Sequence, residues 1–286
     1  MDAVTLDSAW YKWDWAVRHS QLLQADIVST LKPDGDPDSD SVLRIGQEYD
    51  PQLQAWVVKV TFVGIIPPRL SLLAGDAIQN FRSALDHLAW FLAQRSPRAS
   101  PLTKDQERGI YFPFCNTEEH FAHSIPRKLP GVPETDLAII RQYQPYITGD
   151  ELIDRHAFRV LADLSDHDKH RTLQPVGIRL SSVECKAINS HDCVIRRIIT
   201  SKSTELIHVN TKLATIFTRK TGPNPTFQVE IQPAADVAFN ENIWVKNLLD
   251  NVQENVFKLL LAFGAPPDEL VISEPAGGQK TPLEAS

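Results

Sequence analysis

The chain has 286 residues, of which 42% are hydrophobic and 23% are charged, and these are ordinary proportions for a folded globular protein. A chain of this length buries a core large enough to be stable without disulfides, and its three cysteines are too few for a disulfide framework. The formal net charge of -7 excludes a broad basic surface for non-specific DNA binding, although it is compatible with a local basic patch.

Several other classes of protein are disfavoured by what the sequence lacks. It contains no run of 18 apolar residues, so we expect no membrane partner, and the first residues do not resemble a signal peptide. We therefore expect a cytoplasmic protein. No glycine-rich phosphate loop and no Cys-x-x-Cys pair occurs, and we expect no bound cofactor.

The first half of the chain predicts helices around one hairpin. Apolar residues at helical spacing predict a helix within residues 1–30, and a loop rich in Pro, Asp and Gly follows it. β-Branched residues then predict a hairpin of strands 42–49 and 54–66. A second helix is expected at 68–94, because Pro68 is well placed at a helix start.

The second half predicts a loop, two helices, a β-rich region and a final helix. We expect a long loop at 95–133, a short helix at 134–143 and a longer helix at 150–171. Short β-rich runs follow at 174–180, 186–188, 193–200, 205–218 and 226–231. The last helix is expected at 240–263, with Asn240 as its N-cap.

Helices and strands are therefore segregated along the chain, which is typical of the α+β class. We predict a helical bundle with an N-terminal β-hairpin and an antiparallel β-sheet inserted before the last helix. The expected divisions are a motif-bearing bundle with the hairpin at 1–171 and a sheet region at 172–236. A C-terminal helix at 237–265 should pack back on the bundle, before a loose tail at 266–286.

The helix at 68–94 has an apolar face and a polar seam when it is drawn as a wheel of 100° per residue. The expected core face comprises Ala77, Ile78, Phe81, Ala84, Leu85, Leu88, Ala89, Phe91 and Leu92. The polar seam beside it contains Asp76, Asn80, Ser83 and His87. Arg82 lies at the other edge, about 140° from His87. Such polar residues either face solvent or build a functional site.

The helix at 150–171 carries polar residues where its apolar stripe would continue. Its core face is marked by Ile153, Ala157, Val160 and Leu164. His167, Asp168 and Arg171 continue that stripe, and His156, Asp163 and His170 lie along its flank. Because an unsatisfied buried polar group costs roughly 1–3 kcal/mol, either the helix ends near Asp166 or this end of the bundle contains a hydrogen-bonded polar pocket.

Two segments resemble a bacterial group of uncharacterised proteins. They are Asn-Phe-Arg-Ser-Ala-Leu-Asp-His-Leu-Ala at 80–89 and His-Asp-Lys-His-Arg at 167–171. A Phe-Pro pair at 112–113 and a Leu-Pro-Gly segment at 129–131 lie between them, as in that group. The resemblance spans about residues 1–175, and the group has no known activity.

The segment from Arg82 to His87 also resembles the R-x4-6-H motif of HEPN domains, helical bundles many of which are RNases of toxin or defence systems. The resemblance implies a metal-independent endoribonuclease that acts on RNA as a homodimer. It implies that Arg82 stabilises the transition-state charge and that His87 is the general acid and base. The expected supporting pocket comprises Asn80, Asp86, His167, Asp168, Lys169, His170 and Arg171.

A metal-dependent enzyme is an alternative interpretation of the same helices. Asp163 and His167 are four residues apart, as are Asp166 and His170, and carboxylates and imidazoles on adjacent helices form metal sites in helical bundles. The metal ligands would then be Asp163, His167 and His170.

A non-catalytic helical-bundle module is the third interpretation. Its polar pocket would be structural, with Asp86 or Asp168 pairing with Arg171 or Arg82 between helices. The sequence leaves open which of the three holds, and therefore whether the chain is an enzyme.

Overall fold

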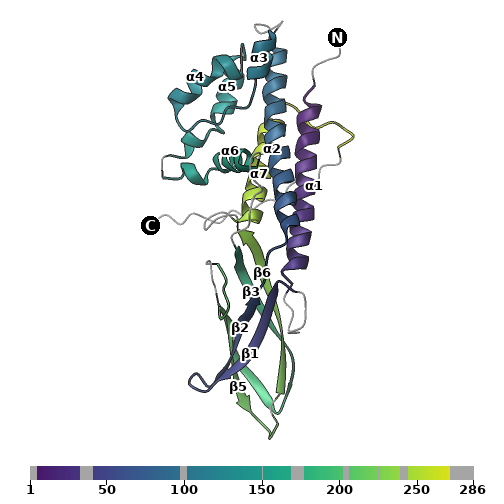
Figure 1. The fold of residues 1–286 in the computed structure, drawn as a ribbon, viewed down its shortest axis with the longest axis vertical. Coiled ribbons are helices and arrows are strands. Elements are labelled where there is room, and N and C mark those ends of the chain that lie inside the picture. Colours follow the sequence, from purple (N-terminus) through teal and green to yellow (C-terminus); the bar gives the residue numbers. More distant parts are fainter. Residues whose placement is uncertain are drawn as a thin grey trace. The chain divides into compact units, whose positions relative to one another are not determined.

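The computed structural model describes residues 5–32, 41–96, 102–149, 151–168, 177–201, 206–224, 226–238 and 244–270. Over these residues the chain is an α+β protein, as the sequence predicted (Figure 1). The helices are α1 (Asp7–Thr30), α2 (Pro68–Arg95), α3 (Lys104–Gly109), α4 (Glu118–Lys128), α5 (Glu134–Arg141), α6 (Ala157–Asp168) and α7 (Val245–Leu261). The strands are β1 (Leu43–Asp50), β2 (Ala55–Val63), β3 (Gly177–His191), β4 (Cys193–Thr200), β5 (Lys212–Lys220) and β6 (Thr226–Ala238).

Two compact units divide the chain, and each is assembled from separate segments. The first unit comprises residues 1–18, 76–166 and 250–286, and the second comprises 19–75 and 167–249. All six strands belong to the second unit. The predicted hairpin is present, and the sheet strands precede the last helix, as expected.

In the second unit, the hairpin joins strands that are far away in sequence. Strands β1, β2, β5 and β4 form one antiparallel sheet in that order, and β3 and β6 form a separate pair. Trp56 of β2 pairs with Ile216 of β5. At the hairpin turn, the carboxylate of Asp50 accepts hydrogen bonds from the backbone N–H groups of Gln52 and Leu53, at 2.9 and 3.1 Å. A side chain that satisfies its own turn in this way favours a tight reversal there.

Strand lengths differ from those predicted. A single strand, β3, replaces the two short runs expected at 174–180 and 186–188, and β6 extends to Ala238 instead of ending at 231. The register of β3 with β6 shifts between Leu180 and Ser182 and again between Ala187 and Asn189. Each shift interrupts the alternation of inward and outward side chains, so one long strand looks like short runs in the sequence.

The run at 205–218 was also predicted incorrectly as one strand. Leu206 makes only an isolated bridge with Arg179, and β5 starts at Lys212. Between them a turn forms, in which the backbone N–H of His208 donates to the hydroxyl of Thr211 at 2.9 Å. Asn210 in this turn has a φ of 74°, a left-handed conformation that asparagine tolerates well.

The region at 95–133 was predicted as a loop, but it contains α3 and α4. Thr103 caps α3 in a reciprocal capping box with Gln106, and the side chain of Thr117 accepts a hydrogen bond from the backbone N–H of His120 in α4. Both helices are short, and α4 contains Pro126. Short polar helices of this kind are specified by their caps and lack a long apolar stripe.

The helix predicted at 150–171 is interrupted. A short 3-10 turn at Ile153–Arg155 precedes α6, and His156 between them has an extended backbone. Its Nδ1 accepts a hydrogen bond from the N–H of Phe158 at 3.2 Å, which satisfies one of the free donors at the start of α6. This break explains why Ile153 is only half-buried although Ala157 and Val160 are buried.

Asp236 satisfies a backbone donor at the start of the last helix, while the predicted N-cap cannot be compared. Asn240 lies outside the described residues. The carboxylate of Asp236, a buried side chain, accepts a hydrogen bond from the N–H of Lys246 in the first turn of α7, at 3.0 Å. A carboxylate at a helix N-terminus satisfies a free donor and interacts favourably with the helix dipole.

A cluster of aromatic side chains forms one part of the core of the first unit. Trp10 and Trp13 of α1 contact each other and Phe257 of α7, with ring centroids 5.3–5.9 Å apart. Trp13 Nε1 also donates to the carbonyl of Gln253 at 3.0 Å. These contacts fasten the later part of α7 against the start of α1.

Candidate functional site

The core face predicted for α2 is confirmed. Eight of its nine residues are buried, and Phe91 is half-buried. The predicted polar seam is not fully solvated, because Asn80, Ser83 and His87 are half-buried and only Asp76 is exposed. What Asn80 and His87 can do therefore depends on the side chains around them.

Arg82 contacts an aromatic segment of the same unit. Its guanidinium lies 4.2 Å from the ring centroid of Phe114, and its Nε donates to Asp86 Oδ2 at 3.3 Å. The other oxygen of Asp86 accepts a hydrogen bond from the backbone N–H of Phe112 at 2.9 Å. Arg82 and Asp86 together fasten the Phe112-Pro113-Phe114 segment to α2, and only 15% of the Arg82 side chain is exposed.

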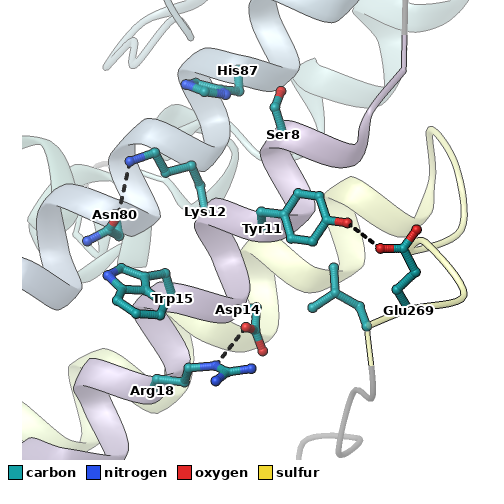
Figure 2. A pocket seen from close by; sticks show the side chains of 10 residues that line it. Ser8, Tyr11, Lys12, Asp14, Trp15, Arg18, Asn80, His87 and Glu269 are labelled. Atoms are coloured by element: carbon teal, nitrogen blue, oxygen red, sulfur yellow. Dashed lines mark hydrogen bonds and ion pairs between the residues drawn. The ribbon is translucent and has the colours of Figure 1, made fainter.

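His87 instead lines an open cleft of about 770 Å³ in the first unit (Figure 2). Two α2 residues, Asn80 and His87, line it. Glu269 and Leu270, which follow α7, line it as well. The lining residues from α1 are Ser8, Tyr11, Lys12, Asp14, Trp15 and Arg18.

One end of the cleft combines an imidazole with a cation. Figure 2 shows His87 near Ser8, with Lys12 one turn further along α1. Lys12 Nζ donates to Asn80 Oδ1 at 3.3 Å, and Asn80 Nδ2 in turn donates to the carbonyl of Asp76 at 2.8 Å. Asn80 thereby orients the ammonium group.

The pKa of His87 lies below its ordinary value. Partial burial is the main cause, and the positive charge of Lys12 adds to it, while the carboxylate of Asp86 opposes both. The imidazole is therefore neutral at neutral pH. A neutral imidazole in an accessible cleft is able to accept a proton from a bound group.

The other end of the cleft exposes aromatic rings beside charged groups. Tyr11 is 46% exposed and Trp15 is 53% exposed. The hydroxyl of Tyr11 donates to Glu269 Oε2 at 3.3 Å. Arg18 Nε donates to Asp14 Oδ2 at 2.8 Å, and the guanidinium of Arg18 lies 5.9 Å from the ring centroid of Trp15.

The residues predicted to form one catalytic site are therefore not all together. Arg82 and His87 point away from α2 in different directions, one toward Phe114 and the other into the cleft. Asn80 shares the cleft with His87, whereas Asp86 lies with Arg82. This separation follows from the five-residue spacing, which turns two helical side chains about 140° apart.

His167 and Asp168 of the predicted supporting pocket are not among the residues that line the cleft. His167 is exposed and Asp168 is half-buried. Lys169, His170 and Arg171 lie outside the described residues.

The alternative metal site, Asp163, His167 and His170, stays a prediction because His170 is not described. Asp163 forms an ion pair with Arg159 at 3.1 Å, and partial burial raises the pKa of its carboxyl group. Among the residues that the structure describes, no group of three or more His, Cys, Asp or Glu side chains is placed to hold a metal ion.

Sequence reasoning missed the α1 side of the cleft. The sequence predicts that the tryptophans of the first helix are core residues, and this is right for Trp10 and Trp13, which are 0% and 2% exposed. Trp15 differs because it lies on the same helix face as Tyr11 and Arg18, at spacings of four and three residues. Two aromatic residues and a cation on one face were the available signal.

Comparisons with known proteins add no further assignment. No protein-family model matches the chain, and neither a curated protein nor a solved structure is detectably similar to it. Within the described residues, no helix combines the length and the apolar character needed to cross a membrane. The structure thus defines an α+β protein whose helical unit contains an open cleft lined by exposed aromatic rings and by side chains of both charges.

Proposed function

We propose that the chain is a metal-independent endoribonuclease that binds single-stranded RNA in the cleft lined by α1 and α2. The observation that supports this most is that His87, whose pKa is lowered by burial and by the charge of Lys12, lines with Lys12 an open cleft that also exposes aromatic rings. The HEPN-like motif contributes His87 to this proposal, whereas the cation is Lys12 instead of Arg82.

The chemistry of the cleft favours a nucleic-acid ligand. The ammonium group of Lys12 suits a phosphate, and the exposed rings of Tyr11 and Trp15 suit unpaired bases, which stack on aromatic side chains. The net charge of -7 does not conflict with this, because a short ligand meets only the cleft. With few phosphate contacts, binding should depend only weakly on salt concentration.

The proposed reaction is an internal phosphoryl transfer. The neutral imidazole of His87 accepts the proton of a ribose 2′-hydroxyl, and that oxygen attacks the adjacent phosphorus. The bond from phosphorus to the 5′-oxygen breaks, and the imidazolium returns the proton to that oxygen. The products are a 2′,3′-cyclic phosphate and a 5′-hydroxyl, and no water or metal is consumed. Lys12 stabilises the charge on the phosphoryl oxygens.

The test is cleavage of a fluorescently labelled single-stranded RNA by the full chain in EDTA. We expect His87→Ala to lose activity by roughly 10²–10⁴-fold, and Lys12→Ala to lose less. His123→Ala and Lys104→Ala are matched controls, because both residues are exposed and lie outside the cleft. A DNA of the same sequence should remain intact because it lacks the 2′-hydroxyl. Unchanged cleavage by the His87 variant would refute this role.

A non-catalytic module is the second candidate, and one observation favours it. Arg82 and Asp86 both contact the Phe112–Phe114 segment, so packing alone explains why these two residues of the motif are present, without any catalytic role. In that case the cleft binds RNA without cutting it. A homodimer remains a separate proposal, and it matters for Arg82, because the family resemblance has the motif arginine acting near a dimer interface. Loss of cleavage in Arg82→Ala with unchanged stability would favour that arrangement.

A further inference from the structure

We propose that the end of the cleft formed by Asp14, Trp15 and Arg18 is a nucleobase subsite that selects an unpaired guanine. This inference rests on the proposed function for its ligand class, RNA, but it concerns binding and not cleavage. It names a substrate preference that the resemblance to HEPN domains does not supply.

Trp15 provides the stacking surface. Trp10 and Trp13, the other tryptophans of α1, are buried, whereas Trp15 is 53% exposed within a concave site. The Arg18 guanidinium lies 5.9 Å from its ring centroid, so the ring already takes part in one cation–π contact. A planar base that stacks here extends this arrangement, because bases stack on both aromatic rings and guanidinium planes.

Asp14 provides the selectivity. Its carboxylate accepts a hydrogen bond from Arg18 through Oδ2, and its side chain remains 18% exposed in the cleft. An ionised carboxylate only accepts hydrogen bonds. Guanine is the base with two adjacent donors on its Watson–Crick edge, N1–H and the N2 amino group, which match the two carboxylate oxygens. Adenine, cytosine and uracil each place an acceptor beside their donor, and that acceptor would face the negative charge.

The position of the subsite relative to the proposed catalytic group is also suitable. Figure 2 shows Asp14, Trp15 and Arg18 at one end of the cleft and His87 with Ser8 at the other. The seven residues from Ser8 to Trp15 correspond to about 10 Å along α1. Lys12 lies between the two ends, so a nucleotide with its base on Trp15 would direct its phosphate toward the ammonium group.

The test uses fluorescein-labelled 2′-O-methyl pentanucleotides, which cannot undergo the internal transfer, in an anisotropy titration of the full chain. Each is a uridine run with guanine, inosine, adenine or cytosine at the centre, and the all-uridine pentamer is the reference. We expect guanine to bind about tenfold more tightly than adenine, cytosine or uracil. Inosine should be intermediate because it keeps N1–H but lacks the amino group.

Variants separate stacking from edge recognition. Trp15→Ala should weaken binding of every pentamer about tenfold, and Trp15→Phe should restore much of it. Asp14→Asn should remove the preference for guanine, because the amide presents only one acceptor oxygen. Leu22→Ala is the matched control, since Leu22 is 57% exposed on α1 and does not line the cleft.

The outcomes distinguish this inference from the proposed function. Equal affinity for all five pentamers, or a guanine preference that persists in Asp14→Asn, would overturn the subsite even if RNA is cleaved. A guanine preference with no cleavage of any RNA would support the subsite and refute the nuclease. Absence of binding to every pentamer would overturn the subsite as well.

Discussion

Removing the Asp86 carboxylate should destabilise the first unit measurably. Phe112 is fully buried, and its backbone N–H donates to Asp86 Oδ1 at 2.9 Å. In Asp86→Ala that donor loses its acceptor, which costs about 1–3 kcal/mol. The ion pair with Arg82, whose side chains are 15% and 25% exposed, adds roughly 0.5–1 kcal/mol. We therefore expect Asp86→Ala to lower the free energy of unfolding by about 1.5–4 kcal/mol.

Urea unfolding followed by tryptophan fluorescence measures this loss, since α1 contributes buried tryptophans to the same unit. Asp86→Asn keeps an oxygen acceptor for Phe112 and loses only the charge, so it should cost about 1 kcal/mol. Asp105→Ala is the control, because its side chain is 96% exposed and 4.0 Å from its partner Arg108. A loss of less than about 0.5 kcal/mol in Asp86→Ala, which is the size expected for an ordinary surface substitution, would refute the reasoning.

A double-mutant cycle measures how strongly Arg82 and Asp86 act together in holding the Phe112–Phe114 segment on α2. Arg82→Ala loses the contact with the Phe114 ring, worth about 0.5–2 kcal/mol, and the ion pair with Asp86. Because both single variants lose that same pair, the double variant should be less destabilised than the sum of the two. Additive losses would mean that Arg82 and Asp86 do not act as one unit.

Two further predictions concern α1 and the cleft. Trp13→Ala should cost about 3–5 kcal/mol of unfolding free energy, because it leaves a cavity beside Phe257 and removes the hydrogen bond to Gln253, whereas Trp15→Ala should cost less than about 1 kcal/mol; equal losses in urea titrations would contradict the packing. The folded-state pKa of His87 lies below its unfolded value near 6.5, so the unfolded chain binds more protons as pH falls below 6.5 and stability decreases. His87→Gln should therefore reduce the fall in the urea midpoint between pH 7 and 5, and an unchanged slope would show that another group is responsible.

Periodic patterns predicted the two long helices α1 and α2 well, because helical periodicity reports burial directly. The apolar arc of α2 identified eight residues that are buried, and the bounds of α1 and α2 lie within a few residues of those expected. The pattern could not separate Trp15 from Trp10 and Trp13, because hydrophobicity alone does not say whether a large ring covers a core or lines a cleft. That distinction depends on which helices pack on each face.

Features that depend on distant pairing or on single side chains could not be predicted in this way. The N-terminal hairpin pairs with β5, which starts about 150 residues later, and no local pattern encodes that partner. The interruption before α6 depends on the side chain of His156, which accepts the N–H of Phe158. Helix α3 depends on the reciprocal bonds of Thr103 and Gln106, a signal that four residues carry without any apolar stripe.

The motif segments acquire different functions once their contacts are known. Arg82 and Asp86 are one helical turn apart and both contact the Phe112–Phe114 segment. His87 follows Asp86 directly, so it is turned about 100° from it and faces the cleft. An Arg and a His five residues apart therefore need not share one site. In this chain the arginine secures the helix that presents the histidine, and Lys12 of α1 supplies the cation beside it.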